Sequence, residues 1–300
     1  MLKSMIRSLP GFKWGLFLGL YLLACPPLLA GMLGDAAPEL QVREWIQGGP
    51  LKLEDGAGKL IYVVEFWQTE CPHCLESLPY LSVLQEQYQS DGVVFIGISG
   101  EDAATVRAFL EGGPAVGYAL AVDDEDKTYA HYMEAFGISG VPHAFIIGRQ
   151  GRILWQGHPM DDLDKVLDQV VTGRYELAEA QNVSRAEKLL SVYVYLLIET
   201  DEADLARRVG ERVYGYGRND PALLGKLGRF IMNSEKVKAP DLELAARAAR
   251  RACEVTGEAD PRALELYADV LHRMGSEEKA RRYRKKAGRL NGEKKDARPQ

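Results

Sequence analysis

The pattern of apolar and polar positions divides the chain into two regions of different character, which meet near Gly173. In the first region, short apolar runs of strand length alternate with segments that carry apolar residues at helical spacing. The runs at 60–67 and 93–99 are almost continuously apolar, which is typical of strands buried on both faces. The other expected strands are 118–122 and a hairpin of 143–147 and 152–156, and the expected helices are 75–89, 103–110, 127–135 and 161–171. Strands that alternate with helices and end in a hairpin predict an α/β domain with a mixed sheet flanked by helices.

Strand patterns vanish after Gly173, and Ala, Leu, Arg and Glu dominate as far as Leu290. Segments with the periodicity of helices follow one another across short turns, at 184–199, 202–215, 221–233, 241–256, 261–274 and 276–288. In the last pair, small residues have the spacing at which a tetratricopeptide (TPR) hairpin packs closely, and a second copy lies about one repeat upstream. These small residues are Ala268, Gly275, Ala280 and Ala287, with Ala245 and Ala252 in the upstream copy. We therefore predict an all-α, TPR-like helical-repeat domain after the α/β domain.

The N-terminus has the pattern of an export signal, because basic residues precede an uncharged run from Trp14 to Leu33. The whole run is about long enough to span a bilayer, which needs ~20 residues, but Pro26-Pro27 interrupts it. The residues from Leu22 to Cys25 resemble a bacterial lipoprotein signal, although Pro26 is an unusual neighbour for a lipidated cysteine. Retention as an anchor, lipidation and cleavage therefore stay open. In each case the basic flank stays inside and the rest is exported to an extracytoplasmic, oxidising compartment such as the periplasm.

The expected organisation follows from these patterns. It comprises a signal peptide or membrane anchor at 1–34, an α/β domain at 35–174, a linker at 175–183, helical repeats at 184–290 and a disordered tail at 291–300. The composition is that of an ordinary globular protein, with 46% hydrophobic residues and a formal net charge of −6. Because nucleic-acid binding draws on Lys and Arg that face phosphates, we expect no nucleic-acid partner. The basic run at 281–286 is interpreted as a solvated helix face.

Candidate chemistry lies in the motif Cys71-Pro72-His73-Cys74, which directly follows the expected strand at 60–67. A helix that begins at about Cys71 places the first sulfur at a helix N-terminus, where unpaired N–H groups and the helix dipole favour the thiolate. The thiolate attacks disulfides, so Cys71 is the expected nucleophile and Cys74 the resolving thiol, and the two form the expected disulfide. The motif has no second cysteine pair and no nearby His cluster to complete a zinc site, so we expect neither a metal nor another cofactor.

With these features the region from Pro38 to Arg174 resembles the exported thioredoxin-like reductases (redoxins) typified by TlpA and ResA. The resemblance rests on Trp45, Phe66-Trp67, the cysteine motif, Gly140-Val141-Pro142 before a strand, Gly151-Arg152-Ile153 and the stretch from Trp155 to Pro159. The extra helix and strand between Ser99 and Val122 match the insertion that separates this family from plain thioredoxin. The resemblance implies a thioredoxin fold and thiol–disulfide oxidoreductase activity.

The resemblance also implies roles for three further residues. Pro142 matches the family's cis-proline, which lies against the dithiol and lets Val141 present its backbone to a substrate chain. Glu65 matches the buried carboxylate that takes and returns the proton of the resolving cysteine, and burial should raise its pKa toward neutrality.

The residues next to the cysteines have opposing expected effects on the direction of electron flow. Pro72-His73 is the inner dipeptide of the strong oxidant DsbA, and His73 near Cys71 would stabilise the thiolate. Glu70 occupies a position where most relatives have Trp, and its carboxylate would oppose thiolate formation. We expect a potential between those of thioredoxin, ~−270 mV, and DsbA, ~−120 mV. His143, which follows Pro142, is a weaker candidate for the same cleft, because relatives usually have Thr there.

The function expected from these observations is reduction or exchange of disulfides in exported proteins, with a second protein as redox donor or acceptor and the helical repeats docking partners. The N-terminal segment would provide the contact with the membrane. One alternative is a repeat-based binding or scaffold module with an accessory redoxin domain, but such a module has no need of both thiols. Another is a thiol peroxidase, but Thr69-Glu70-Cys71 lacks the Thr-x-x-Cys spacing of that family.

Overall fold

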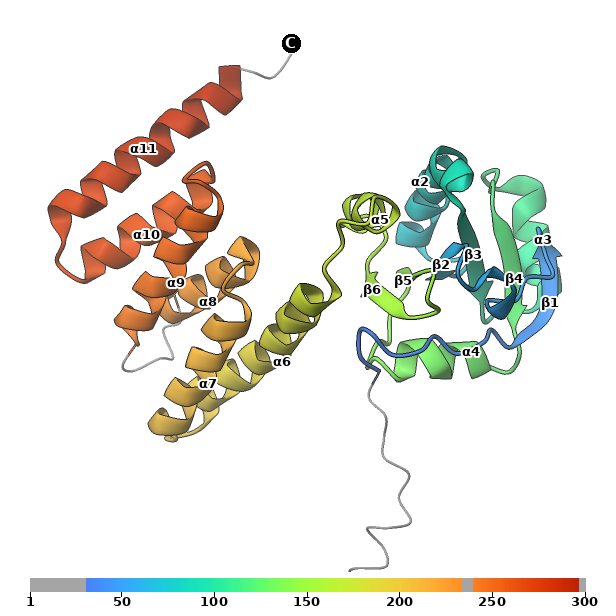
Figure 1. Cartoon of the computed structure of the whole chain (residues 1–300), viewed down its shortest axis with the longest axis horizontal. Helices are drawn as coiled ribbons and strands as arrows, with labels where there is room; N and C mark the ends of the chain where they lie inside the picture. Colours follow the sequence, from blue (N-terminus) through green and yellow to red (C-terminus); the bar gives the residue numbers. More distant parts are fainter. Residues whose placement is uncertain (1–30, 234–239, 297–300) are drawn as a thin grey trace, which may run out of the picture. The chain divides into compact units, whose positions relative to one another are not determined.

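The computed structural model describes residues 31–233 and 240–296, so the predicted export segment lies almost entirely outside the described residues. The chain forms two compact units, of which the first ends at Tyr175 and the second begins at Glu176. The first unit contains the sheet and the second is helical (Figure 1).

The first unit is built on a six-stranded mixed sheet with the strand order β1-β4-β3-β2-β5-β6. Its strands are β1 (Val42–Gln47), β2 (Ile61–Phe66), β3 (Val93–Ser99), β4 (Ala119–Asp123), β5 (His143–Ile147) and β6 (Ile153–Gly157). The three central strands β4, β3 and β2 are parallel, whereas β1, β5 and β6 pair with their neighbours in antiparallel fashion. Every residue of β2 is buried because both faces of the sheet are covered, which explains its continuous apolar run.

Helices lie on both faces of this sheet (Figure 1). They are α2 (Pro72–Tyr88), α3 (Ala103–Gly112), α4 (Lys127–Tyr129) with the π-helical segment η3 (Ala130–Glu134), and α5 (Leu163–Val171), besides the 3-10 turns η1 (Glu54–Gly56) and η2 (Gln89–Asp91). Ile61 and Val63 of β2 pack into one apolar cluster with α2, α3 and α5, while Tyr62 and Val64 pack into the other with η3. This alternation is the period of a strand. The predicted α/β class of this unit is therefore confirmed.

Two local features of this unit differ from the sequence prediction. Strand β1 lies in the stretch before Leu60, where no strand was predicted from the sequence. It is an edge strand with exposed polar positions such as Glu44, and its pairing with β4 is irregular, so it lacks a strong apolar pattern. The helix predicted at 127–135 is a short α-helix that continues as η3.

The second unit consists of helices that pack as consecutive pairs. They are α6 (Leu177–Glu199), α7 (Ala203–Tyr216), α8 (Pro221–Asn233), α9 (Leu242–Val255), α10 (Pro261–Arg273) and α11 (Glu277–Asp296). The pairs are α6 with α7, α8 with α9 and α10 with α11 (Figure 1). Asp220, Asp241 and Asp260 cap the starts of α8, α9 and α10 by accepting backbone N–H groups. The alanines singled out by their spacing, Ala245, Ala252, Ala268, Ala280 and Ala287, are all buried.

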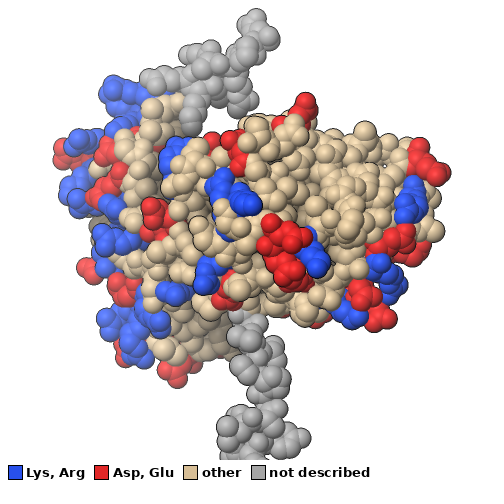
Figure 2. Space-filling view, turned by 45° about the vertical axis from the view of Figure 1, so that its right-hand side comes forward, with Lys and Arg blue, Asp and Glu red and all other residues tan. Residues whose placement is uncertain are grey.

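The helices extend further than the sequence analysis expected. Helix α6 begins at Leu177, within the stretch predicted as a linker, because residues from Leu177 to Ala180 are good helix formers that continue into the periodic segment. Helix α11 runs to Asp296, past the predicted start of the tail, and 297–300 lie outside the described residues. On the face shown in Figure 2, basic and acidic side chains are interspersed.

Candidate active site

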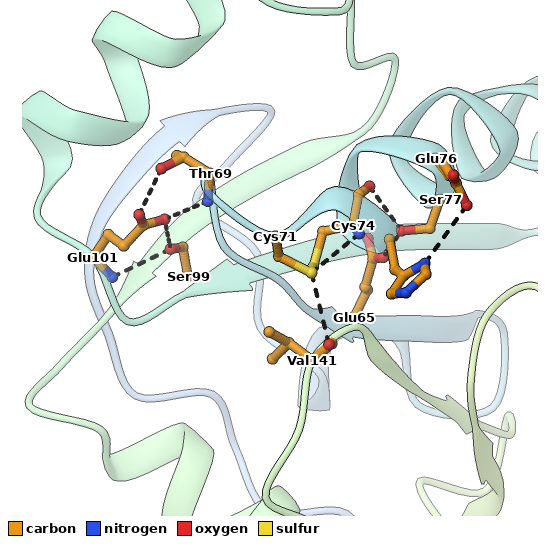
Figure 3. Close-up of a disulfide and its surroundings, with 10 residues drawn as sticks. Glu65, Thr69, Cys71, Cys74, Glu76, Ser77, Ser99, Glu101 and Val141 are labelled. Carbon is orange, nitrogen blue, oxygen red and sulfur yellow. Dashed lines mark hydrogen bonds and ion pairs between the residues drawn. A yellow bond between two sulfur atoms is a disulfide. The ribbon is translucent and has the colours of Figure 1, made fainter.

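The cysteine pair lies where β2 leads into α2. Cys71 is the N-cap of α2 and Pro72 occupies the first helical position, where its missing N–H removes no helical hydrogen bond. The backbone N–H of Cys74 donates to the sulfur of Cys71 over 3.2 Å. Cys71 and Cys74 are joined as a disulfide with a Cα–Cα distance of 5.2 Å (Figure 3). Cys71 is partly exposed whereas Cys74 is completely buried, so only the first sulfur is open to another protein.

The loop before β5 lies against the exposed cysteine. The peptide bond between Val141 and Pro142 is cis. The carbonyl oxygen of Val141 is 3.7 Å from Cys71 Sγ (Figure 3). The structure thus brings together two segments 70 residues apart in sequence.

Glu65 lies in the middle of this unit, on β2, with none of its surface exposed. Ser77 Oγ donates to Glu65 Oε1 over 2.6 Å, and the Tyr118 hydroxyl donates to Glu65 Oε2 over 2.9 Å. Burial raises the pKa of Glu65 to about 7, and the two hydrogen bonds offset part of this rise. Burial also raises the pKa of Tyr118, and the nearby Glu65 carboxylate adds to that effect. The site therefore holds a carboxyl group that changes its protonation near neutral pH.

Ser77 and Tyr118 were not predicted from the sequence as partners of Glu65. Ser77 gave one signal, since it is a polar residue next to Leu78 on the apolar face of an amphipathic helix. Tyr118 gave none, because it lies 53 residues from Glu65 in sequence and reaches it only through the pairing of strands.

A second polar cluster holds the chain just before the cysteines. Glu101, which follows β3, accepts the backbone N–H of Thr69 over 2.8 Å and the Thr69 hydroxyl over 2.6 Å. Ser99 Oγ donates to the same carboxylate over 3.0 Å (Figure 3). Glu101 was not among the site residues predicted from the sequence, although its contacts fix the loop that leads into Cys71.

The remaining predicted residues lie at the rim of the site. Glu70 and Pro72 are exposed. The His73 side chain is 74% exposed, with Nδ1 3.7 Å from Glu76 Oε2 and its ring centroid 6.4 Å from that of His158. His73 therefore lies near Glu76 and His158, and its expected effect on the Cys71 thiolate stays a prediction.

His143 begins β5 next to Pro142, and its ring is hydrogen-bonded to the side chain of Gln156. Burial lowers the pKa of His143. Within the described residues, no group of three or more His, Cys, Asp or Glu side chains is arranged to hold a metal ion.

The sequence and the fold of this chain are similar to those of known proteins. Residues 33–156 match the AhpC/TSA family. Protein FixW of Rhizobium leguminosarum is 30% identical over 173 residues, which cover 55% of this chain and 77% of FixW. Thiol-disulfide oxidoreductase ResA of Geobacillus thermodenitrificans is 27% identical over 122 residues, covering 40% of this chain and 66% of ResA. Among solved structures, a putative thiol:disulfide interchange protein DsbE from Chlorobium tepidum aligns with 49% of this chain and 100% of its own at 26% identity, with a TM-score of 0.39. The chain therefore belongs to the AhpC/TSA redoxin family, as a thioredoxin-fold relative of the ResA- and TlpA-like thiol–disulfide oxidoreductases.

Proposed function

We propose that this thiol–disulfide oxidoreductase reduces or exchanges disulfides in exported proteins, with Cys71 as the attacking thiol and Cys74 as the resolving thiol. The observation that carries the proposal is the asymmetry of the pair. Cys71 is partly exposed at the N-terminus of α2, where it accepts the N–H of Cys74, whereas Cys74 is buried. A helix N-terminus stabilises a thiolate, and the thiolate is the attacking species.

The reaction conserves electrons within the two sulfur pairs. The Cys71 thiolate attacks one sulfur of a client disulfide, and the other client sulfur leaves as a thiolate that takes up a proton. The Cys74 thiol then loses its proton, attacks Cys71 and releases the second client sulfur. The client disulfide becomes two thiols, and Cys71 and Cys74 become the disulfide. Exchange in the opposite direction follows the same steps in reverse.

Glu65 is the proposed acceptor of the Cys74 proton. A base works best when its pKa lies near the operating pH, and burial brings the pKa of Glu65 to about 7. Ser77 connects Glu65 to this cysteine, because its hydroxyl oxygen is 2.6 Å from Glu65 Oε1 and 3.0 Å from the Cys74 carbonyl oxygen (Figure 3). A surface carboxylate with an ordinary pKa would be a much weaker base for a thiol.

The client chain is proposed to lie along Val141. Its carbonyl oxygen, 3.7 Å from Cys71 Sγ, offers an acceptor to an extended backbone that brings a disulfide to that sulfur. A hollow of about 260 Å³ adjoins this residue and is lined also by Trp67, Gln68 and Tyr129. It provides space for a client side chain next to Val141.

The peroxidase alternative has less support at the same site. In that chemistry a threonine hydroxyl is available to the reactive cysteine, whereas the Thr69 hydroxyl donates to Glu101. The scaffold alternative assigns the work to the second unit, which we propose docks protein partners for the dithiol. Peroxide consumption by the reduced protein, compared with its reduction of insulin, separates the peroxidase from the oxidoreductase.

The place of action is proposed to be extracytoplasmic, on the basis of the basic and apolar pattern at 1–34. No helix among residues 31–233 and 240–296 has the length and apolar character needed to cross a membrane. Fusion of residues 1–34 to a reporter that is active only after export tests this proposal.

Reduction of insulin by the purified protein, with dithiothreitol as electron source, tests the roles of the cysteines. We expect Cys71→Ser to reduce the rate to that without protein, and Cys74→Ser to accumulate a mixed disulfide between Cys71 and the client. Activity unaffected by Cys71→Ser contradicts the mechanism. Redox titration of the pair then gives the direction of electron flow, with a potential at or below ~−270 mV contradicting the expected range.

A further inference from the structure

The carboxyl group of Glu65 is surrounded by groups that cannot neutralise its charge. Its neighbours across the sheet are Gly97 on β3 and Ala144 on β5. Its hydrogen-bond partners are the hydroxyls of Ser77 on α2 and Tyr118 before β4, and Ser77 also contacts the carbonyl oxygen of Cys74 (Figure 3). Among the described residues Glu65 forms no ion pair, so the charge of its carboxylate is stabilised only by hydrogen bonds from two neutral hydroxyls.

The Ser77 hydroxyl lies within hydrogen-bond distance of two acceptor oxygens. Its oxygen lies 2.6 Å from Glu65 Oε1 and 3.0 Å from the carbonyl oxygen of Cys74, and it is completely buried. A serine hydroxyl carries one proton and two acceptor lone pairs. The hydroxyl can therefore donate to only one of these two oxygens in any one state.

Each protonation state of Glu65 is compatible with a different direction of the Ser77 hydroxyl. When Glu65 is ionised, it accepts from both Ser77 and Tyr118. When Glu65 is protonated on Oε1, that oxygen donates to Ser77 Oγ, and the serine proton turns to the Cys74 carbonyl oxygen. Tyr118 continues to donate to Oε2. Both states satisfy every donor without the movement of a heavy atom, which matters because a buried donor without a partner destabilises the folded protein.

We propose that Ser77 is a positioning residue of the dithiol site, whose hydroxyl donates to Glu65 when that carboxyl is ionised and to the Cys74 carbonyl oxygen when it is protonated. The inference rests on the proton-exchange role proposed for Glu65. It assigns to Ser77 a link between the state of the base and the backbone of the cysteine that the base serves.

The link predicts a coupled titration that needs no client. In the oxidised protein Cys71 and Cys74 form a disulfide and do not titrate. The 13C chemical shifts of the Glu65 carboxyl carbon and the Cys74 carbonyl carbon can therefore be followed by NMR between pH 5 and pH 9 without a contribution from these two thiols. We expect both signals to move with one midpoint near the pKa of Glu65, which is about 7. Separate midpoints in the wild-type protein contradict the proposal.

Variants at Ser77 and Tyr118 distinguish a hydroxyl that alternates between two acceptors from one that donates to Glu65 alone. Ser77→Ala should abolish the response of the Cys74 carbonyl and raise the midpoint of Glu65 by about one pH unit, because the ionised form loses the stronger hydrogen bond. Ser77→Thr should restore both signals. Tyr118→Phe should also raise the midpoint but keep the Cys74 response, since that donor contacts Glu65 alone. A Cys74 response that persists in Ser77→Ala overturns the proposal.

Two controls separate this inference from the catalytic proposal. Thr256→Ala removes another hydroxyl that donates to helix carbonyl oxygens, those of Ala252 and Cys253, and has no hydrogen bond to Glu65, so both titrations should remain unchanged. In Glu65→Gln the Cys74 response should disappear. If the protein fails to reduce insulin but the coupled titration is present, the proposed function fails and the role of Ser77 stands. If insulin is reduced without the coupling, only the role of Ser77 is refuted.

Discussion

The two compact units bury different kinds of side chain. In the redox unit, which ends at Tyr175, five polar or charged residues are buried among the described residues 31–175, namely Glu65, Ser77, Ser99, Asp123 and Thr128. In the described part of the helical unit no polar or charged residue is buried, and alanines and leucines form the core. Burial of polar groups costs free energy unless each finds a hydrogen-bond partner. The redox unit buries polar groups around the site where we propose proton exchange, whereas the described core of the helical unit consists of apolar side chains.

The hydrogen bonds of the buried polar groups follow this division. Asp123 accepts the backbone N–H groups of Thr128 and Tyr129, and Ser99 donates to Glu101. Such networks fix one conformation of the surrounding loops because every member needs its partner. In the helical unit the charged pairs are exposed, as between Arg284 and Asp269, and such pairs each contribute little to stability.

Matched core truncations should have the largest effect and should separate the two units. Leu81→Ala in α2 and Leu264→Ala in α10 each remove a side chain that is completely buried, at an expected cost of about 2–5 kcal/mol. All four tryptophans precede Glu176, so tryptophan fluorescence during urea unfolding follows the redox unit, while far-UV circular dichroism also follows the helices. Leu81→Ala should shift the fluorescence midpoint, and Leu264→Ala only the dichroism midpoint. Equal fluorescence shifts would mean that the units unfold together.

Replacement of the buried carboxyl should remove a pH dependence that the helical unit lacks. The folded-state pKa of Glu65, about 7, lies above its ordinary value of 4.5, so its contribution to stability is complete below pH 4.5 and is lost as the pH rises through 7. This interval of about 2.5 units corresponds to about 3 kcal/mol. In Glu65→Gln this part of the slope should be absent when fluorescence-detected unfolding of the oxidised proteins is compared at pH 4.5 and pH 8. Parallel stability curves for the two proteins would show that Glu65 titrates in its ordinary range.

Substitutions of two glycines in α7 should have the smallest effect, and they test how closely this helix packs against its neighbours. A Cβ at Gly210 would lie 2.8 Å from side-chain carbons of Leu244 and Tyr193, whereas Gly215 has open space around it. Gly215→Ala should stabilise the helical unit by up to about 1 kcal/mol through helix propensity. Gly210→Ala should cancel that gain and destabilise by about 1 kcal/mol, because overpacking forces neighbours apart. Dichroism-detected unfolding measures both, and an equal gain for the two variants would show that α7 is loosely packed.

Local sequence patterns predicted most helices and strands because the apolar pattern of a segment depends on how that segment itself is buried. The apolar run at 60–67 became β2, buried on both faces, and the helical periodicities became α7 to α10 within a few residues of their expected ends. The edge strand β1 was missed because an exposed edge needs no apolar pattern. The start of α6 was placed too late, since helix-forming residues before its apolar segment carry no periodic signal.

The sequence by itself determined the α/β class of the first unit, the helical character of the second and the position of Cys71 at the start of a helix. Each of these depends on side-chain periodicity or on neighbours a few residues apart. Only the tertiary structure decided that Ser77 and Tyr118 contact Glu65, that Glu101 holds Thr69, and that Val141 lies against Cys71. Except at Ser77 and Glu65, which a strand and the following helix bring together, these contacts involve segments next to the ends of different strands, and no local pattern records which distant strands pair.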